Sequence, residues 1–157
     1  MNIMICDDQI NELENIKQVV SEYEKAHAEL LFTINCFLNP LDMLDYITQK
    51  GAPDIALLDI CMPGILGTEI AKEIQRKGED NTDIIFLTTS SDFAVEAFAL
   101  HVNDYLTKPF SVEELLARLR VTQRRLSQMQ AENGVQSAVF ENGALRIEYA
   151  AGCAYLD

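Results

Sequence analysis

Short apolar runs alternate along the chain with longer segments whose apolar residues recur every three or four positions. The apolar runs predict five strands, at residues 2–6, 30–37, 54–59, 83–88 and 104–107. The segments between them show helical spacing, for example at Leu13, Ile16 and Val20. Strands that alternate with helices favour crossover units, so we expect an α/β fold with a parallel sheet covered on both faces.

Helix starts are chemically marked at two places. Asn39 before Pro40 is typical of an N-cap followed by proline at the first helical position. Ser111 with Glu114 matches a capping box, and the last helix of this region is predicted from about Val112 into the 120s.

The segment at residues 93–102 is apolar and also has helical spacing. Phe93, Val95 and Phe98 at this spacing predict side chains that face the core. Exposed positions would instead indicate a surface for a partner.

The character of the chain changes after residue 126. Residues 127–136 are polar and reach Asn133-Gly134, which predicts a linker. Residues 137–157 contain two strand-like runs around Asn142-Gly143, a strong hairpin signal, and form a short β-like extension. They are too few to bury a core, so they are a fragment of a further domain, a domain-swapping arm or a tail packed on the first domain. We favour the fragment, which divides the chain into a domain at 1–126, a linker and this piece.

Composition narrows the classes of partner and the compartment. The 157 residues carry 12 Lys and Arg against 25 Asp and Glu, a net charge of −13, so the chain should repel nucleic acid and anionic membranes. Its four cysteines lack C-x-x-C spacing and suit reduced thiols. We see no signal peptide and no apolar run long enough for a membrane span, and we expect a cytoplasmic protein.

Polar side chains follow four of the five predicted strands. Asp7 and Asp8 follow the first strand, Asp59 ends the third, Thr88 ends the fourth and Lys108 follows the fifth. Each alone has an ordinary explanation as a helix cap, a strand end or a solvated charge. In a parallel sheet, however, all these strand ends meet at one edge, where ligands bind. Together they favour a functional site.

The residue types at this edge indicate phosphoryl chemistry. Three converging carboxylates repel one another, so their pKa values would rise unless a cation were present. Oxygen ligands without His or Cys select a hard metal, and so few carboxylates suit Mg²⁺ better than Ca²⁺. Lys108 and Thr88 would contact phosphoryl oxygens, and Asp59 would be the nucleophile that forms an acyl phosphate.

Four segments carry a resemblance to a known family. They are "ICDD" at 5–8, "LLDICMPGILG" at 57–67, "IIFLTTS" at 84–90 and "DYLTKPF" at 104–110. In this order, and over about residues 1–125, the chain resembles the receiver domain of bacterial two-component response regulators. The resemblance implies a flavodoxin-like, doubly wound sheet of order 2-1-3-4-5.

The resemblance assigns a role to each residue of the metal site. Asp59 would be the phosphoacceptor. Asp8, Asp59 and the backbone carbonyl of Cys61 would bind Mg²⁺, and Asp7 would help to hold the waters of the metal.

The same resemblance assigns the residues that respond to phosphorylation. Lys108 would pair with the phosphoryl group, aimed by a cis peptide bond to Pro109. Thr88 and Tyr105 would be the switch pair, in which the hydroxyl moves toward the phosphate and the ring turns inward.

Partners follow from the resemblance as well. A sensor histidine kinase would donate the phosphoryl group, and a homodimer would form through the fourth helix, fifth strand and fifth helix. The chain would catalyse only its own phosphoryl transfer and autodephosphorylation.

Residues 141–157 and the stretch "TTSSDFAVEAFAL" at 88–100 resemble LytTR-type regulators, in which a receiver precedes a mostly β DNA-binding domain. Transcription control, and any DNA contact, would then depend on the rest of that domain.

Two other classes of protein compete with this interpretation. A pseudo-receiver would keep the fold as a binding or dimerisation module without phosphorylation, but this chain retains every acid and the lysine. A phosphatase with an aspartate nucleophile would usually need a second acid two residues further on, where this chain has Cys61.

Overall fold

The computed structural model describes residues 1–78, 81–136, 139–142, 145–148 and 153–156. They divide into two units, Met1–Leu119 and Arg120–Asp157. None of the helices in the described ranges has the length and apolar character that a membrane crossing requires.

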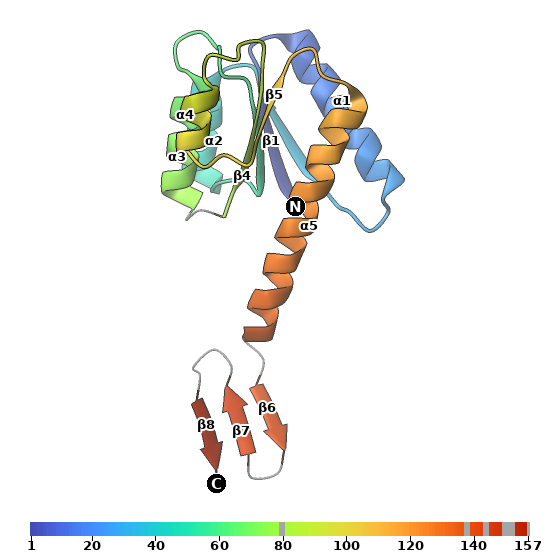
Figure 1. Cartoon of the computed structure of the whole chain (residues 1–157), viewed down its shortest axis with the longest axis vertical. Coiled ribbons are helices and arrows are strands. Elements are labelled where there is room, and N and C mark those ends of the chain that lie inside the picture. Colours follow the sequence, from blue (N-terminus) through green and yellow to red (C-terminus); the bar gives the residue numbers. More distant parts are fainter. Residues whose placement is uncertain (79–80, 137–138, 143–144, 149–152, 157) are drawn as a thin grey trace. The chain divides into compact units, whose positions relative to one another are not determined.

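Five parallel strands form the sheet of the first unit (Figure 1). They are β1 (Asn2–Cys6), β2 (Thr33–Phe37), β3 (Ile55–Leu58), β4 (Asp83–Thr88) and β5 (Asp104–Thr107). Their order is β2-β1-β3-β4-β5, which confirms the predicted doubly wound topology. Strand β2 is shorter than the predicted strand at residues 30–37, since it begins only at Thr33.

Helices cover both faces of this sheet, as predicted. They are α1 (Ile10–Ala26), α2 (Pro40–Lys50), α3 (Gly67–Gly78), α4 (Ala94–Ala99) and α5 (Val112–Gln136). Helix α1 and the first turns of α5 lie on one face, and α2, α3 and α4 lie on the other (Figure 1).

Side chains of the central strands point alternately to the two faces of the sheet and form a hydrophobic core on each face. Met4, Ala56 and Phe86 are fully buried in a cluster with apolar residues of α2, α3 and α4. Ile5 and Leu57 are also fully buried, and because successive strand residues face opposite sides, they point toward α1 and α5. Burial on both faces explains why these strands are continuous apolar runs.

Both marked helix starts are confirmed. The side chain of Asn39 accepts a hydrogen bond from the amide of Leu41 at 2.8 Å, and Pro40 is the first residue of α2. The hydroxyl of Ser111 accepts one from the amide of Glu114 at 3.1 Å. Each cap satisfies an amide that the first helical turn leaves without a partner.

The prediction that Phe93, Val95 and Phe98 face the core is confirmed for Phe93, which is partly buried against it, and wrong for the other two. Their side chains are 83% and 84% exposed, and Ala97 is the buried residue of α4. Residues of an α-helix are about 100° apart, so when Ala97 faces the sheet, Phe98 and Val95 point away from it. The alternative, an exposed apolar surface, is what the structure has.

The expected linker at residues 127–136 is helical and belongs to α5. Its Ser, Gln, Met, Ala and Glu residues are compatible with a helix, and Asn133-Gly134 does not end it.

Beyond α5, the strands β6 (Val139–Asn142), β7 (Leu145–Glu148) and β8 (Cys153–Leu156) pair antiparallel. The strands of the predicted hairpin are confirmed, while its turn residue Gly143 lies outside the described residues. The domain division at residues 126 and 136 stays a prediction.

We expect Gly67→Ala to destabilise the first unit by about 1–3 kcal/mol, the usual cost of overpacking. A Cβ on Gly67 would collide with the backbone carbonyl of Asp59 and with Ile60. The matched control is Gly64→Ala, where a Cβ meets open space and only the positive φ of 91° is strained. Urea unfolding of both variants measures the difference, and a Gly67→Ala variant as stable as the wild type would contradict the collision.

Candidate functional site

The carboxyl ends of β1 and β3 lie side by side where the strand order reverses. The backbone amide of Asp59 donates to the carbonyl of Cys6 at 2.9 Å, which ties the two strand ends together. Asp7 and Asp8 follow β1 directly, and Asp59 follows β3. The topology therefore brings these three acids to the edge where doubly wound sheets bind ligands.

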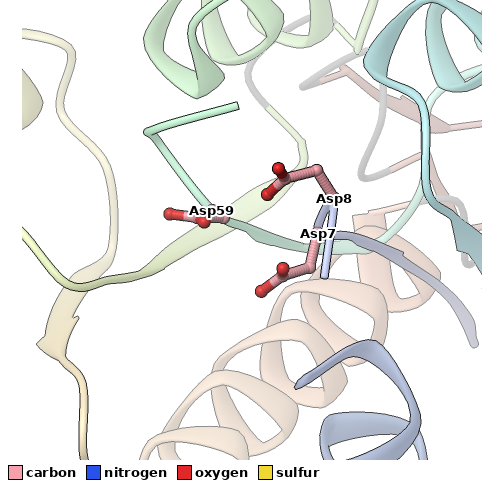
Figure 2. A group of neighbouring side chains, drawn as sticks. All are labelled: Asp7, Asp8 and Asp59. Atoms are coloured by element: carbon pink, nitrogen blue, oxygen red, sulfur yellow. The ribbon is translucent and has the colours of Figure 1, made fainter. Parts of the chain in front are cut away.

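The three carboxylates form one cluster. Each offers an oxygen that lies within 4.8 Å of the others, and Figure 2 shows all three side chains extending to the same side. Asp7 and Asp59 are buried, and the Oδ1 atom of Asp8 is buried without a hydrogen-bond partner. Burial raises the pKa of Asp7, against the opposing effect of its hydrogen bond from Lys108.

This donor set fits a hard divalent cation. All three ligands are carboxylate oxygens, and a buried acid oxygen without a partner is costly unless something binds it. Mg²⁺ prefers such oxygens and keeps several waters, so a cluster of few carboxylates suits it.

Lys108 brings the main positive charge of the site. Its ammonium lies 2.5 Å from Asp7 Oδ2 and 3.9 Å from Asp59 Oδ2, and the side chain is 7% exposed. The backbone amide of Lys108 donates to the carbonyl of Thr88 at 2.7 Å, and its peptide bond to Pro109 is cis, as the resemblance implies. The end of β5 is thereby held beside the end of β4.

The sequence did not predict that Glu12 reaches this site. Its Oε2 atom lies 3.8 Å from the Lys108 ammonium. An acid in the first turn of a helix is ordinarily explained by the helix dipole. The available signal was its position in the first turn of α1, a few residues after the acids at the end of β1.

A tight loop connects Asp59 to the start of α3. The amide of Cys61 donates to Asp59 Oδ1 at 3.2 Å, and the amide of Gly67 donates to the carbonyl of Ile60 at 2.9 Å. Gly64 takes a positive φ of 91°, a conformation that favours glycine. Cys61, two residues after Asp59, is exposed, whereas Asp59 itself is only 4% exposed.

The residues of the predicted switch pair lie on β4 and β5. Thr88 is fully buried, with its hydroxyl 3.9 Å from the sulfur of Cys61. The hydroxyl of Tyr105 donates to the carbonyl of Ser90, and its ring meets Phe86 edge-on with centroids 6.2 Å apart. Burial raises the pKa of the Tyr105 hydroxyl. Tyr105 therefore contacts the segment that follows Thr88.

A pocket of about 590 Å³ adjoins the site. Residues of α1 line it together with the segment that leads from Lys108 into α5. Its lining combines apolar side chains, such as Ile16 and Phe110, with the acids Glu12 and Glu22. It thus offers an apolar surface with acidic groups beside the Lys108 ammonium.

Known proteins share this arrangement of fold and sequence. Residues 3–120 match the family described as response regulator receiver domain. The chain is 32% identical over 126 residues to the uncharacterized transcriptional regulatory protein YkoG of Bacillus subtilis (strain 168), covering 79% of this chain and 51% of that protein. The chain thus spans about half the length of this curated relative.

Solved structures agree. The response regulator protein TrrA from Thermotoga maritima in complex with Mg²⁺-BeF is 30% identical, with a TM-score of 0.65, over 77% of this chain and 97% of that one. The BeF3-activated receiver domain of DrrB, a Thermotoga maritima protein, is 29% identical with a TM-score of 0.66, over 78% and 97%. The chain therefore belongs to the response regulator receiver domain family.

Proposed function

We propose that Asp59 accepts a phosphoryl group from a sensor histidine kinase in the cytoplasm, with Mg²⁺ as cofactor. The observation that carries this proposal is the cluster of Asp7, Asp8 and Asp59, with the Lys108 ammonium paired to two of these acids. Family membership and the Mg²⁺-BeF complex of TrrA support it. The chain would act only on its own phosphoryl group, by transfer and by later hydrolysis.

The proposed reaction is a displacement at phosphorus. A carboxylate oxygen of Asp59 attacks the phosphorus of a phosphohistidine, the bond from phosphorus to the histidine nitrogen breaks, and the electron pair stays on that nitrogen. Lys108 balances the charge of the phosphoryl oxygens. Asp7, Asp8, Asp59 and the backbone carbonyl of Cys61 would hold Mg²⁺, which supplies further positive charge to those oxygens when bound.

Phosphorylation would change the surface beyond the site. It adds negative charge and acceptor oxygens, for which Lys108 and the buried Thr88 hydroxyl are the nearby donors. Tyr105 is bonded to Ser90 behind Thr88, so a shift of Thr88 would pass to α4. The pocket along α1, next to Lys108, suits the approach of the kinase.

We expect incubation with acetyl phosphate and Mg²⁺ to add one phosphoryl group to the wild-type chain and none to Asp59→Asn. Asp59 supplies the nucleophilic carboxylate, which an amide cannot replace. Intact mass spectrometry measures the adduct, and omission of Mg²⁺ should abolish it.

Asp45→Asn is the matched control, because Asp45 is an exposed acid on α2 outside the cluster. It should be labelled like the wild type. If the wild type gains no mass under any of these conditions, the chain is a pseudo-receiver that binds partners without phosphorylation.

The exposed apolar surface of α4 supports a homodimer through α4, β5 and α5. Phe98→Glu should weaken self-association of the phosphorylated chain by about tenfold, because it places a charge where an apolar contact would form. Leu31→Glu is the control, since Leu31 is 81% exposed but precedes β2. Analytical ultracentrifugation compares the variants, and equal association of all of them would exclude this face.

We also propose that β6, β7 and β8 begin a LytTR-type DNA-binding domain, supported by the resemblance of residues 141–157. A longer gene product that contains the rest of this domain should then bind its promoter, whereas the present chain, with its net charge of −13, should not. A gel-shift assay tests this, and promoter binding by the present chain would contradict it.

A further inference from the structure

We propose that Glu12 is a positioning residue, which draws the Lys108 ammonium away from Asp59 and so restrains phosphorylation. The inference rests on the proposed phosphoacceptor function. It adds a residue of this chain to the charge balance of the site.

The geometry places one ammonium among three carboxylates. The Nζ atom of Lys108 lies 3.8 Å from Glu12 Oε2 and 3.9 Å from Asp59 Oδ2, while Asp7 Oδ2 holds it at 2.5 Å. Lys108 carries a single positive charge, and its position decides how strongly it attracts each carboxylate. Glu12 and Asp59 therefore compete electrostatically for the same ammonium at nearly equal distances.

Burial strengthens this competition. The Lys108 side chain is 7% exposed, so solvent screens its interactions less than those of a surface lysine. Among the ion pairs of the described residues, Lys108 is the only cation paired with Asp59. If the Lys108 ammonium moves toward Glu12, no other cation among the described residues takes its place beside Asp59.

The helix dipole explains an acid in the first turn of α1, but not this contact. Glu14 lies on the same helix two residues later, is exposed and does not line the pocket. Glu12 lines the pocket together with Lys108. The dipole would act on the stability of α1, whereas the contact with Lys108 acts on the reaction at Asp59.

The reaction itself sets the sign of the effect. A phosphoryl group on Asp59 increases the negative charge that Lys108 must balance there. The attraction of Lys108 to Glu12 opposes this movement, and the Glu12 charge repels the phosphoryl group. Glu12→Gln should therefore favour phosphorylation. A partly exposed ion pair is worth about 0.2–1 kcal/mol, which corresponds to about a 1.4- to 5-fold change in rate or affinity.

The test compares Glu12→Gln with two matched variants of the full chain. Glu14→Gln removes the same charge from the same helix away from Lys108. Glu22→Gln removes an acid that lines the same pocket but is hydrogen-bonded to Gln18. Labelling by acetyl phosphate with Mg²⁺ is followed over a range of donor concentrations, and beryllofluoride affinity is measured by titration.

Glu12→Gln alone should raise the maximal labelling rate and the beryllofluoride affinity. It should also shift the NMR signals of the Lys108 side chain in the unlabelled protein without added metal, a change that a purely structural role of Glu12 would not cause.

Three results would overturn the inference. In the first, the wild type is labelled but Glu12→Gln changes neither the labelling rate nor the Lys108 signals. This result would contradict the role of Glu12 and still agree with the phosphoacceptor function. The second is equal acceleration in Glu22→Gln, which would mean simple repulsion of the anionic donor. The third is a wild type that is never labelled, which overturns the proposed function as well.

Discussion

The structure depends on the charge balance between Lys108 and the acids at the carboxyl edge of the sheet. Asp7 and Asp59 are buried at the ends of neighbouring strands, where isolated carboxylates are unfavourable. The Lys108 ammonium, 2.5 Å from Asp7, offsets part of that cost. Removing one partner of such a buried pair is usually more destabilising than the pair is stabilising, because the other charge is left without compensation.

The backbone around the cluster is arranged to keep the acids in place. Hydrogen bonds join the ends of β1 and β3 and the ends of β4 and β5. The close approach of Gly67 to the Asp59 carbonyl brings α3 directly against the loop that carries the phosphoacceptor candidate. A rigid sheet thus holds groups that repel one another, and the fold supplies the free energy that this repulsion costs.

The exposed surface of α4 and the pocket along α1 are two chemically different surfaces of the first unit. The first is apolar at Val95 and Phe98. The second combines apolar side chains with acids and adjoins Lys108. Thr88 lies near Cys61 after the acid Asp59, and Tyr105 donates to Ser90 in the segment that leads to α4.

The sequence by itself determined the sheet, its strand order through the family resemblance, and the identity of the clustered acids. These follow from local patterns: apolar runs, caps, and polar residues at strand ends that must meet at one edge. It was wrong about Val95 and Phe98, because helical spacing shows that residues share a face but not which face meets the sheet. It did not predict that residues 127–136 continue α5, because Asn-Gly also occurs within a helix when its neighbours favour one. Only the tertiary structure showed that Glu12 contacts Lys108, since the two are distant in sequence and their separation depends on where the segment after β5 lies relative to α1.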